Sequence, residues 1–445
     1  MQHPHGTPEQ HEHTPDPDVA NHDEHGHDHG HGHGHHPQGI RGRGGFIISG
    51  LTGGHGVFHW FTQSLIVLLP EIREAFALSG GAVGGISTVR ELVSGLVTLP
   101  GGIIADALRK YWGLVLALCM AFFGIGWLII GLAPSYIILL VGMGVVALAA
   151  SIWHLPAMAS LSHHFSHRRG TALSFHGVGG QVGDVIAPPV TVLLLGILTW
   201  QQIISIYAAV PIFLAFLVYW AFKNIGRTGK EDTASRGDQW ETSKRILLNP
   251  ILWIVAFVGG IRGMAFIGLI TFFPLFLDDI GLSPVSRGFH FGALLAVGIV
   301  ATPIVGYLSD KLGRKIVLVP GLILLAVMAY FLGRAEPGIL LIAIVLLMGT
   351  FLYGDQPILT ALALDVVGDE VPTTVLGILS LERFVLSAAS PLIAGWLYDN
   401  GLTFGGIALT GPEATFTYVA ALFLIGAVIL MVTPLPRPAR SPGHH

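Results

Sequence analysis

Histidines one helical turn apart give the first chemical signal in this sequence. His55 and His59 lie four residues apart in an apolar stretch, and Gln63 continues the same face of a predicted helix. Imidazoles can take up protons near neutral pH or bind divalent metals. A single histidine among apolar residues could simply hydrogen-bond a backbone carbonyl, so one such residue proves little.

Polar side chains also fall inside several other apolar stretches. Polar groups on several membrane spans all need hydrogen-bond partners, and a water-filled path for a ligand would supply these partners. We therefore expect one central cavity that is lined by His55, His59, Gln63, His154, His176, Arg262, Tyr353, Asp355 and Gln356.

Two arginine–glutamate neighbours and one aspartate add charges to these stretches. Arg90 precedes Glu91, Glu382 precedes Arg383, and Asp184 lies in a glycine-rich stretch. Each charge is costly in lipid and needs a partner or a wet cavity. We expect these five residues to serve in proton coupling or gating. Asp184 and Glu382 are the first candidates for the group that takes up the proton. Fixed ion pairs that only set helix packing are the alternative.

Arg262 differs from the other intramembrane arginines because its own span offers it no carboxylate partner. A guanidinium binds the oxygens of a carboxylate or phosphonate through two parallel hydrogen bonds. We therefore interpret Arg262 as the hook for an anionic group.

The composition indicates which elements must hold these residues. Of the 445 residues, 52% are hydrophobic and 11% are charged, and the mean hydropathy is +0.68. These values indicate an integral membrane protein, and the lone Cys119 excludes a disulfide framework. Twelve helical spans of about 20 residues or more are predicted at 46–70, 82–105, 112–132, 136–157, 171–198, 201–222, 250–277, 286–308, 316–333, 338–362, 373–398 and 414–433.

The spans fall into two halves with polar segments around them. The predicted fold is an all-α membrane protein of two pseudo-symmetric six-helix bundles. The predicted parts are a disordered His-rich tail at 1–45, a first bundle at 46–222, a cytoplasmic linker at 223–249, a second bundle at 250–433 and a C-terminal tail at 434–445.

The N-terminal segment carries twelve of the 22 histidines. Its glycines, prolines and polar residues bury too little apolar surface to form a core. Imidazoles of this density could bind Zn²⁺ or Ni²⁺, either as a metal buffer or sensor or without any role in the cell. The densest run contains His25, His27, His29, His31, His33, His35 and His36.

Glycine, aspartate and basic residues recur in two loops, nearly half the chain apart. The second loop carries Gly306, Asp310, Gly313, Arg314 and Lys315. The first is a degenerate copy with Gly102, Asp106, Arg109 and Lys110, in which Arg109 takes the place of a glycine.

This loop pattern resembles the signature of the major facilitator superfamily, where it joins helices two and three and helices eight and nine. The resemblance implies alternating access, in which two bundles rock about a central site lined by helices one, four, seven and ten. It also implies that helices two and eleven meet between the halves. No cofactor is implied, and we expect a monomer that works in the bilayer with a small-molecule substrate and protons, without nucleic acid.

Loop charge predicts the orientation. Lys and Arg gather in alternate loops, whereas Arg73, Arg287 and Arg334 fall on the other side. The positive-inside rule therefore places both termini in the cytoplasm, in a bacterial-type inner membrane.

Shorter stretches resemble the fosmidomycin-resistance group of exporters within that superfamily. They include Trp153-His154-Leu155-Pro156 and the run from His163 to Gly170, which leads into a glycine-rich fifth helix. This helix holds Gly177, Gly179, Gly180 and Gly183 before Pro188-Pro189, and it is similar to a motif of superfamily antiporters.

The main functional prediction is proton-coupled efflux of a small organic anion or drug. Export of a divalent metal or metal chelate through His55, His59, His154 and His176 is one alternative, and a membrane metal sensor that transports nothing is another. The sequence shows no P-loop and no persuasive nucleophile or metal-hydrolase arrangement, so we do not expect an enzyme.

Overall fold

The computed structural model describes residues 40–227, 248–367 and 372–435, and the side chains of 99, 102–106, 166, 227, 372–378, 381 and 404 lie outside this description. The elements of the first half are η1 Ile40–Gly42, α1 Gly44–Val67, α2 Leu69–Ala75, α3 Gly80–Ala107, η2 Arg109–Tyr111, α4 Trp112–Gly131, α5 Tyr136–His164, η3 Ser166–Arg168, α6 Arg169–Leu194, α7 Trp200–Phe222 and η4 Ile225–Arg227. Those of the second half are α9 Pro250–Asp279, α10 Pro284–Leu312, α11 Arg314–Leu332, α12 Ile339–Leu352, α13 Asp355–Val367, α14 Pro372–Asn400, β1 Leu402–Phe404, β2 Ile407–Leu409 and α15 Gly411–Val432.

The helical membrane fold is confirmed. Within the described ranges, nine helical segments are long and apolar enough to cross a membrane, and each coincides with an expected span. The remaining three expected spans correspond to α1, α3 and α14. Twelve spans in two sets of six are therefore consistent with the helices.

The β1–β2 hairpin is an exception that we did not predict. Its strands pair antiparallel, and Gly405 and Gly406 form the turn with φ of 59° and 82°. Two consecutive residues with positive φ favour glycine in a tight hairpin turn. The Gly-Gly pair between two apolar residues could therefore have predicted this hairpin turn from the sequence.

One expected span is interrupted and another is followed by a short helix. The first expected span corresponds to α1, and α2 follows it as a separate helix, because Pro70 at the start of α2 lacks the N–H that would continue the α1 ladder. The tenth span, expected to be continuous over 338–362, divides into α12 and α13 around Tyr353 and Gly354.

Glycines let α6 lie directly on α1. A Cβ added to Gly179 would lie 2.3 Å from the Thr52 carbonyl oxygen, and one added to Gly183 would lie 2.4 Å from that of Gly56. Backbones can approach this closely only where side chains are absent. The glycine-rich fifth span therefore positions the polar side chains of α6 against those of α1.

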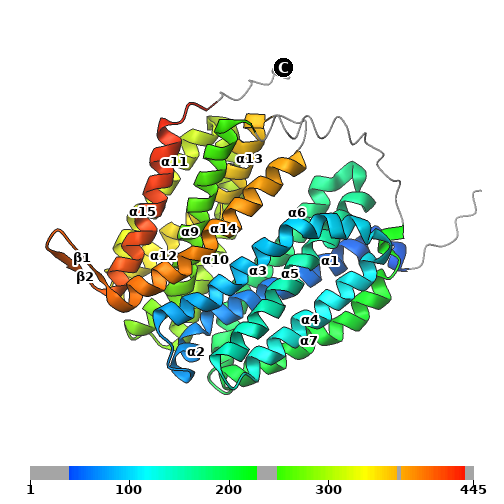
Figure 1. The fold of residues 1–445 in the computed structure, drawn as a ribbon, viewed down its shortest axis with the longest axis horizontal. Helices are drawn as coiled ribbons and strands as arrows, with labels where there is room; N and C mark the ends of the chain where they lie inside the picture. Colours follow the sequence, from blue (N-terminus) through cyan, green and yellow to red (C-terminus); the bar gives the residue numbers. More distant parts are fainter. Residues whose placement is uncertain (1–39, 228–247, 368–371, 436–445) are drawn as a thin grey trace, which may run out of the picture. The chain divides into compact units, whose positions relative to one another are not determined.

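The two halves meet along two helix pairs. In Figure 1, α3 runs beside α14. The α6 helix of the first half likewise packs against α10 of the second. Gly84 of α3 touches the backbone of Pro391, where an added Cβ would lie 2.1 Å from the carbonyl oxygen. Gly288 of α10 similarly faces Val192 of α6. The expected meeting of the second and eleventh spans is thus present.

Polar contacts tie the halves together at one end of these pairs. The Asp399 carboxylate accepts hydrogen bonds from the backbone N–H groups of Gly80 and Gly81 at 2.6 and 2.9 Å. A carboxylate at a helix N-terminus satisfies orphan donors and the helix dipole. Arg73 of α2 pairs with Asp279 of α9 at 3.1 Å.

A second ion-pair group lies at the same end. The buried Arg287 of α10 binds Glu71 of α2 and Asp278 of α9. Burial raises the pKa of the Glu71 carboxyl, and the Arg287 guanidinium opposes this shift. Because the Arg287–Glu71 contact crosses between the halves, it helps to hold this end closed.

We predict that Asp399→Ala loosens the closed end. The substitution removes both bonds to the α3 N-terminus, a loss of about 1 kcal/mol for a helix cap. Spin labels at the exposed Ala75 and Thr403 should therefore show a larger long-distance population. Asn400→Ala is the matched control, because Asn400 bonds only its own helix through the Trp396 carbonyl. Equal distance distributions in the two variants would contradict the prediction.

Candidate functional site

Histidines of α1 and an aspartate of α6 form one hydrogen-bonded chain. His59 Nδ1 lies 3.0 Å from an Asp184 carboxylate oxygen, and Gln63 donates to the same oxygen at 2.9 Å. His59 Nε2 lies 3.0 Å from His55 Nε2, and His55 Nδ1 donates to the His176 carbonyl oxygen at 2.7 Å. The polar face predicted on the first span therefore lies against α6.

Two more imidazoles join this chain, and we call the four the imidazole cluster: His55, His59, His154 and His176. His154 of α5 donates from Nδ1 to the Ala150 carbonyl oxygen at 2.6 Å, and its ring centroid lies 5.0 Å from that of His55. The His176 ring stacks on His55 at 4.1 Å with an interplanar angle of 7°.

Two of the four imidazoles are buried and two are half-buried. His55 and His176 are 8% and 4% exposed, whereas His154 is half-buried and the His59 side chain is 36% exposed. Gly180 makes room for both α1 histidines, because an added Cβ would lie 2.8 Å from His55 and 3.0 Å from His59. The cluster therefore opens through His59.

Arg262, which we interpreted as a hook because its own span offers no carboxylate, has a carboxylate partner on another span. Its Nε donates to Asp355 at 2.7 Å, and its Nη2 lies 2.5 Å from the other Asp355 oxygen and from the Leu352 carbonyl oxygen. Arg262 is 3% exposed and Asp355 is 0% exposed. The partners lie 93 residues apart, so inspection of one span could not find them. This guanidinium is already neutralised, and an added anion would have to displace a carboxylate.

The same pair explains the interruption between α12 and α13. The Leu352 carbonyl would accept from the Gln356 N–H in a continuous helix, but it accepts from Arg262 instead. The Tyr353 hydroxyl and Gln356 Oε1 are buried without a hydrogen-bond partner among the described residues. Buried polar atoms without partners need an explanation, and a ligand or water would supply one.

Charged residues of α3 and α14 lie between the halves. Arg90 donates twice to one Glu91 oxygen, at 3.1 and 2.7 Å, so this predicted pair is present. Arg383 lies within electrostatic range of Glu91 and Arg90 of the first half, and its guanidinium lies 5.6 Å from the Phe384 ring centroid. Within the described residues, Arg383 makes no hydrogen bond, and Glu382 Oε2 is buried without a partner.

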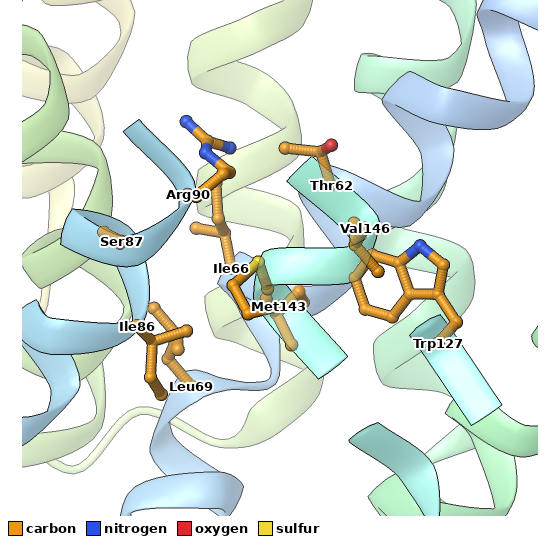
Figure 2. Close-up of a pocket in the computed structure, with 10 residues that line it drawn as sticks. Thr62, Ile66, Leu69, Ile86, Ser87, Arg90, Trp127, Met143 and Val146 are labelled. Carbon is orange, nitrogen blue, oxygen red and sulfur yellow. The ribbon is translucent and has the colours of Figure 1, made fainter. Parts of the chain in front are cut away.

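A small cavity lies beside Arg90 within the first half. Figure 2 shows Arg90 and Thr62 at one side of it, Ile86 and Leu69 lower down, and Trp127 across from them. Its volume is about 20 Å³, which is room for about one water molecule. It is too small for an organic substrate. A larger apolar cavity of about 580 Å³ between α1, α6 and α7 has the exposed Phe175 at its rim, as expected of a lipid-facing groove.

Of the second loop motif, Gly306 and Asp310 lie within α10, and only Gly313 lies between helices. Gly313 joins α10 to α11 at a φ of 107°, which only glycine adopts readily. Arg314 binds Asp310 and also donates to Asp365 of α13 at 3.0 Å, while Lys315 donates to the Thr433 carbonyl oxygen at 2.9 Å.

The first loop motif is described only in part. The side chain of Asp106 and the surroundings of Gly102 lie outside the described residues. Arg109 lies 5.7 Å from the Trp112 ring centroid, and Lys110 lies 5.7 Å from that of Tyr111. The tail histidines His25, His27, His29, His31, His33, His35 and His36 also lie outside the described residues.

Sequence reasoning missed two groups of polar residues. Ser64 Oγ lies 2.9 Å from Thr191 Oγ1, which lies 3.3 Å from the Tyr207 hydroxyl, and this chain extends the polar face of α1. The contacts through which Arg287 and Asp399 join the two halves at one end were missed because hydropathy assigns both residues to loop ends.

The sequence profile of the Major Facilitator Superfamily matches residues 51–391 and 288–444. An uncharacterised MFS-type transporter, YfnC of Bacillus subtilis (strain 168), is 23% identical over 363 residues, which cover 78% of this chain and 86% of that protein. The fosmidomycin resistance protein of Escherichia coli (strain K12) is 25% identical over 58% of this chain and 63% of its own length. The glycerol-3-phosphate transporter of B. subtilis is 23% identical over 55% and 61%, respectively.

The fold has a counterpart among solved structures. A bacterial homologue of the human lysosomal transporter Spinster, crystallised in an inward-facing and unoccupied conformation, superposes with a TM-score of 0.71 and 18% identity, covering 87% of this chain and 95% of that one. Fold and relatives together define a multi-pass membrane transport protein and not an enzyme. The chain belongs to the Major Facilitator Superfamily.

We predict that Arg262 and Asp355 depend on each other for stability. Removing one partner leaves an uncompensated buried charge, so Arg262→Met or Asp355→Leu alone should cost about 3–5 kcal/mol. The double variant Arg262→Met/Asp355→Leu removes both charges and should recover most of the loss. Thermal unfolding of the purified proteins measures the cycle. Independent, additive effects would contradict the pairing.

Proposed function

We propose that this protein is a proton-coupled exporter of a small organic anion that works by alternating access. The observation that carries the proposal is Arg383, an intramembrane arginine that makes no hydrogen bond in the described part of the chain. It lies within electrostatic range of Arg90 and Arg262 and of Glu91 and Asp355, and these two carboxylates neutralise the other two arginines. A bound anion would balance the charge of Arg383, which is costly in a membrane interior.

Arg383 is the arginine that we assign to the anion. Arg90 is held by Glu91, and Arg262 is held by Asp355. Arg383 makes no hydrogen bond in the described part of the chain and contacts the Phe384 ring instead. Its planar guanidinium therefore has donors available for a carboxylate or phosphate, which it can bind through two bonds at once.

Names of relatives support the substrate class and the direction. One relative is named for glycerol-3-phosphate, an anion, and another for resistance to fosmidomycin. Resistance favours export, and we extend this direction to the present chain. Membership of a transporter family favours transport over the alternative of a metal sensor that moves nothing.

We assign the coupled proton to Glu382. Asp184 is engaged by His59 and Gln63, whereas a buried oxygen of Glu382 has no partner among the described residues. Glu382 and Arg383 are consecutive in α14, so a change of charge at the first alters anion affinity at the second. The glycine-rich α6, which resembles antiporter sequences, favours exchange of protons for the anion.

Arg383→Gln should weaken anion binding roughly tenfold to hundredfold, because a charge-assisted bond is lost at a partly desolvated site. Counterflow of radiolabelled glycerol-3-phosphate or a sugar acid in proteoliposomes measures it. Arg334→Gln is the matched control, since Arg334 lies away from the centre beside Glu413 and Tyr330. Unchanged counterflow in Arg383→Gln would contradict the assignment of Arg383 to anion binding.

Glu382→Gln should uncouple anion transport from the proton gradient. The amide keeps the size of the side chain but cannot release a proton, so exchange of anion for anion should persist while transport driven by a pH step is lost. Both are measured in the same proteoliposomes, with Glu413→Gln as the control at an exposed helix cap. Retention of pH-driven transport in Glu382→Gln would exclude this residue as the proton carrier.

A further inference from the structure

We propose that His55, His59 and His154 form a binding site for a first-row transition-metal dication such as Zn²⁺, Ni²⁺ or Co²⁺. One ring nitrogen from each lies within 4.8 Å of the other two. The residues come from α1 and α5 of the first half, apart from the arginine centre of the proposed anion site. The inference concerns a second class of ligand and does not depend on anion transport.

The hydrogen bonds fix the orientation of all three rings. His55 Nδ1 faces the His176 carbonyl, His154 Nδ1 faces the Ala150 carbonyl, and His59 Nδ1 faces the Asp184 carboxylate. A carbonyl oxygen only accepts, so the Nδ1 of His55 and of His154 must carry the hydrogen. With Asp184 accepting likewise from His59, each Nε2 remains for a ligand.

This arrangement is typical of metal-binding imidazoles. Histidine ligands of metals almost always donate their second ring N–H to a carboxylate or backbone carbonyl, which fixes the tautomer. All three rings here have such an acceptor, and one of the acceptors is a carboxylate. Asp184, held by Gln63 as well, acts as a positioning residue for His59.

The spacing of the ring nitrogens suits a cation. His55 Nε2 and His59 Nε2 lie 3.0 Å apart, and two lone pairs repel at this distance unless a proton or a cation lies between them. Nitrogens around a tetrahedral Zn²⁺ at about 2.0–2.1 Å would be about 3.3–3.4 Å apart. The His154 nitrogen lies within 4.8 Å of those of His55 and His59, so it has to move closer to them when an ion binds.

His176 gives an independent sign of a missing ligand. It is 4% exposed, and neither ring nitrogen makes a hydrogen bond within the described residues, although the Leu51 carbonyl lies near the ring. Buried imidazole nitrogens are normally satisfied. Because this ring stacks on His55, a metal or its bound water beside the three ligands would supply the absent partner.

The surroundings favour a borderline-soft dication over an alkali or alkaline-earth ion. Imidazole nitrogens suit Zn²⁺, Ni²⁺ and Co²⁺, whereas Mg²⁺ and Ca²⁺ prefer oxygen ligands. The Trp153 ring lies parallel to His55, and Phe58 lies 6.0 Å from His154, so one wall is apolar. The exposed side of His59 leaves a route for the ion to enter. Arg90 lies within electrostatic range of His59, but Glu91 neutralises it.

The test uses the full-length chain with the twelve histidines of residues 1–36 and His444 and His445 replaced by serine, so that the termini bind no metal. The purified protein is titrated with Co²⁺, followed by its visible d–d absorption, and the bound Co²⁺ is then displaced with Zn²⁺. We expect one equivalent of Co²⁺ with the spectrum of low-coordinate nitrogen ligation. His59→Gln and His154→Gln should each weaken binding by roughly 100-fold or more, beyond the usual effect of losing an outer-shell partner.

His290→Gln is the matched control. Its Nδ1 bonds the Ser286 carbonyl at 2.8 Å, as His154 bonds that of Ala150, but it lies outside the imidazole cluster. Thermal unfolding checks each variant, and if His154→Gln fails to fold, the partly exposed His59→Gln decides. Absence of a stoichiometric Co²⁺ site, or a site that survives His59→Gln, would overturn the proposal.

Discussion

An ionised side chain in the hydrocarbon region must find a partner, and this constraint organises the centre of the molecule. Arg262 and Asp355 meet it by binding each other and by taking the Leu352 carbonyl out of its helix. Arg90 meets it through its neighbour Glu91. Arg383 is the exception among the described intramembrane arginines. It contacts the Phe384 ring, and carboxylates act on it only over a longer distance. The proposed anion site follows from this imbalance.

Close helix packing places these groups where they can act together. Glycines of α6 bring its backbone against α1, so that Asp184 reaches His59. Glycines of α3 and α10 bring the two halves into contact at the end where Asp399 and Arg287 tie them. A carrier that alternates must break those contacts, and most of them are short polar bonds, which can be exchanged for water when the end opens. The apolar packing within each half can stay unchanged.

Features that depend on residues close together in the sequence were predictable. Hydropathy located the spans, the spacing of His55, His59 and Gln63 placed them on one face, and the adjacency of Arg90 and Glu91 predicted their ion pair. Contacts between distant residues were not predictable in this way. Nothing near Arg262 in the sequence points to Asp355, and the interruption of the tenth span is a consequence of that pair. The closing role of Asp399 likewise depends on the α3 N-terminus, more than 300 residues away. A pair of this kind leaves no local pattern in a single sequence.

The most direct test of the anion-carrier account is a charge measurement on the unaltered protein. Proteoliposomes adsorbed on a solid-supported membrane are exposed to concentration jumps of small carboxylates, sugar acids and phosphate esters. The account predicts saturable transient currents for a subset of these anions and none for neutral sugars or organic cations of similar size. Currents elicited only by neutral or cationic compounds would contradict it.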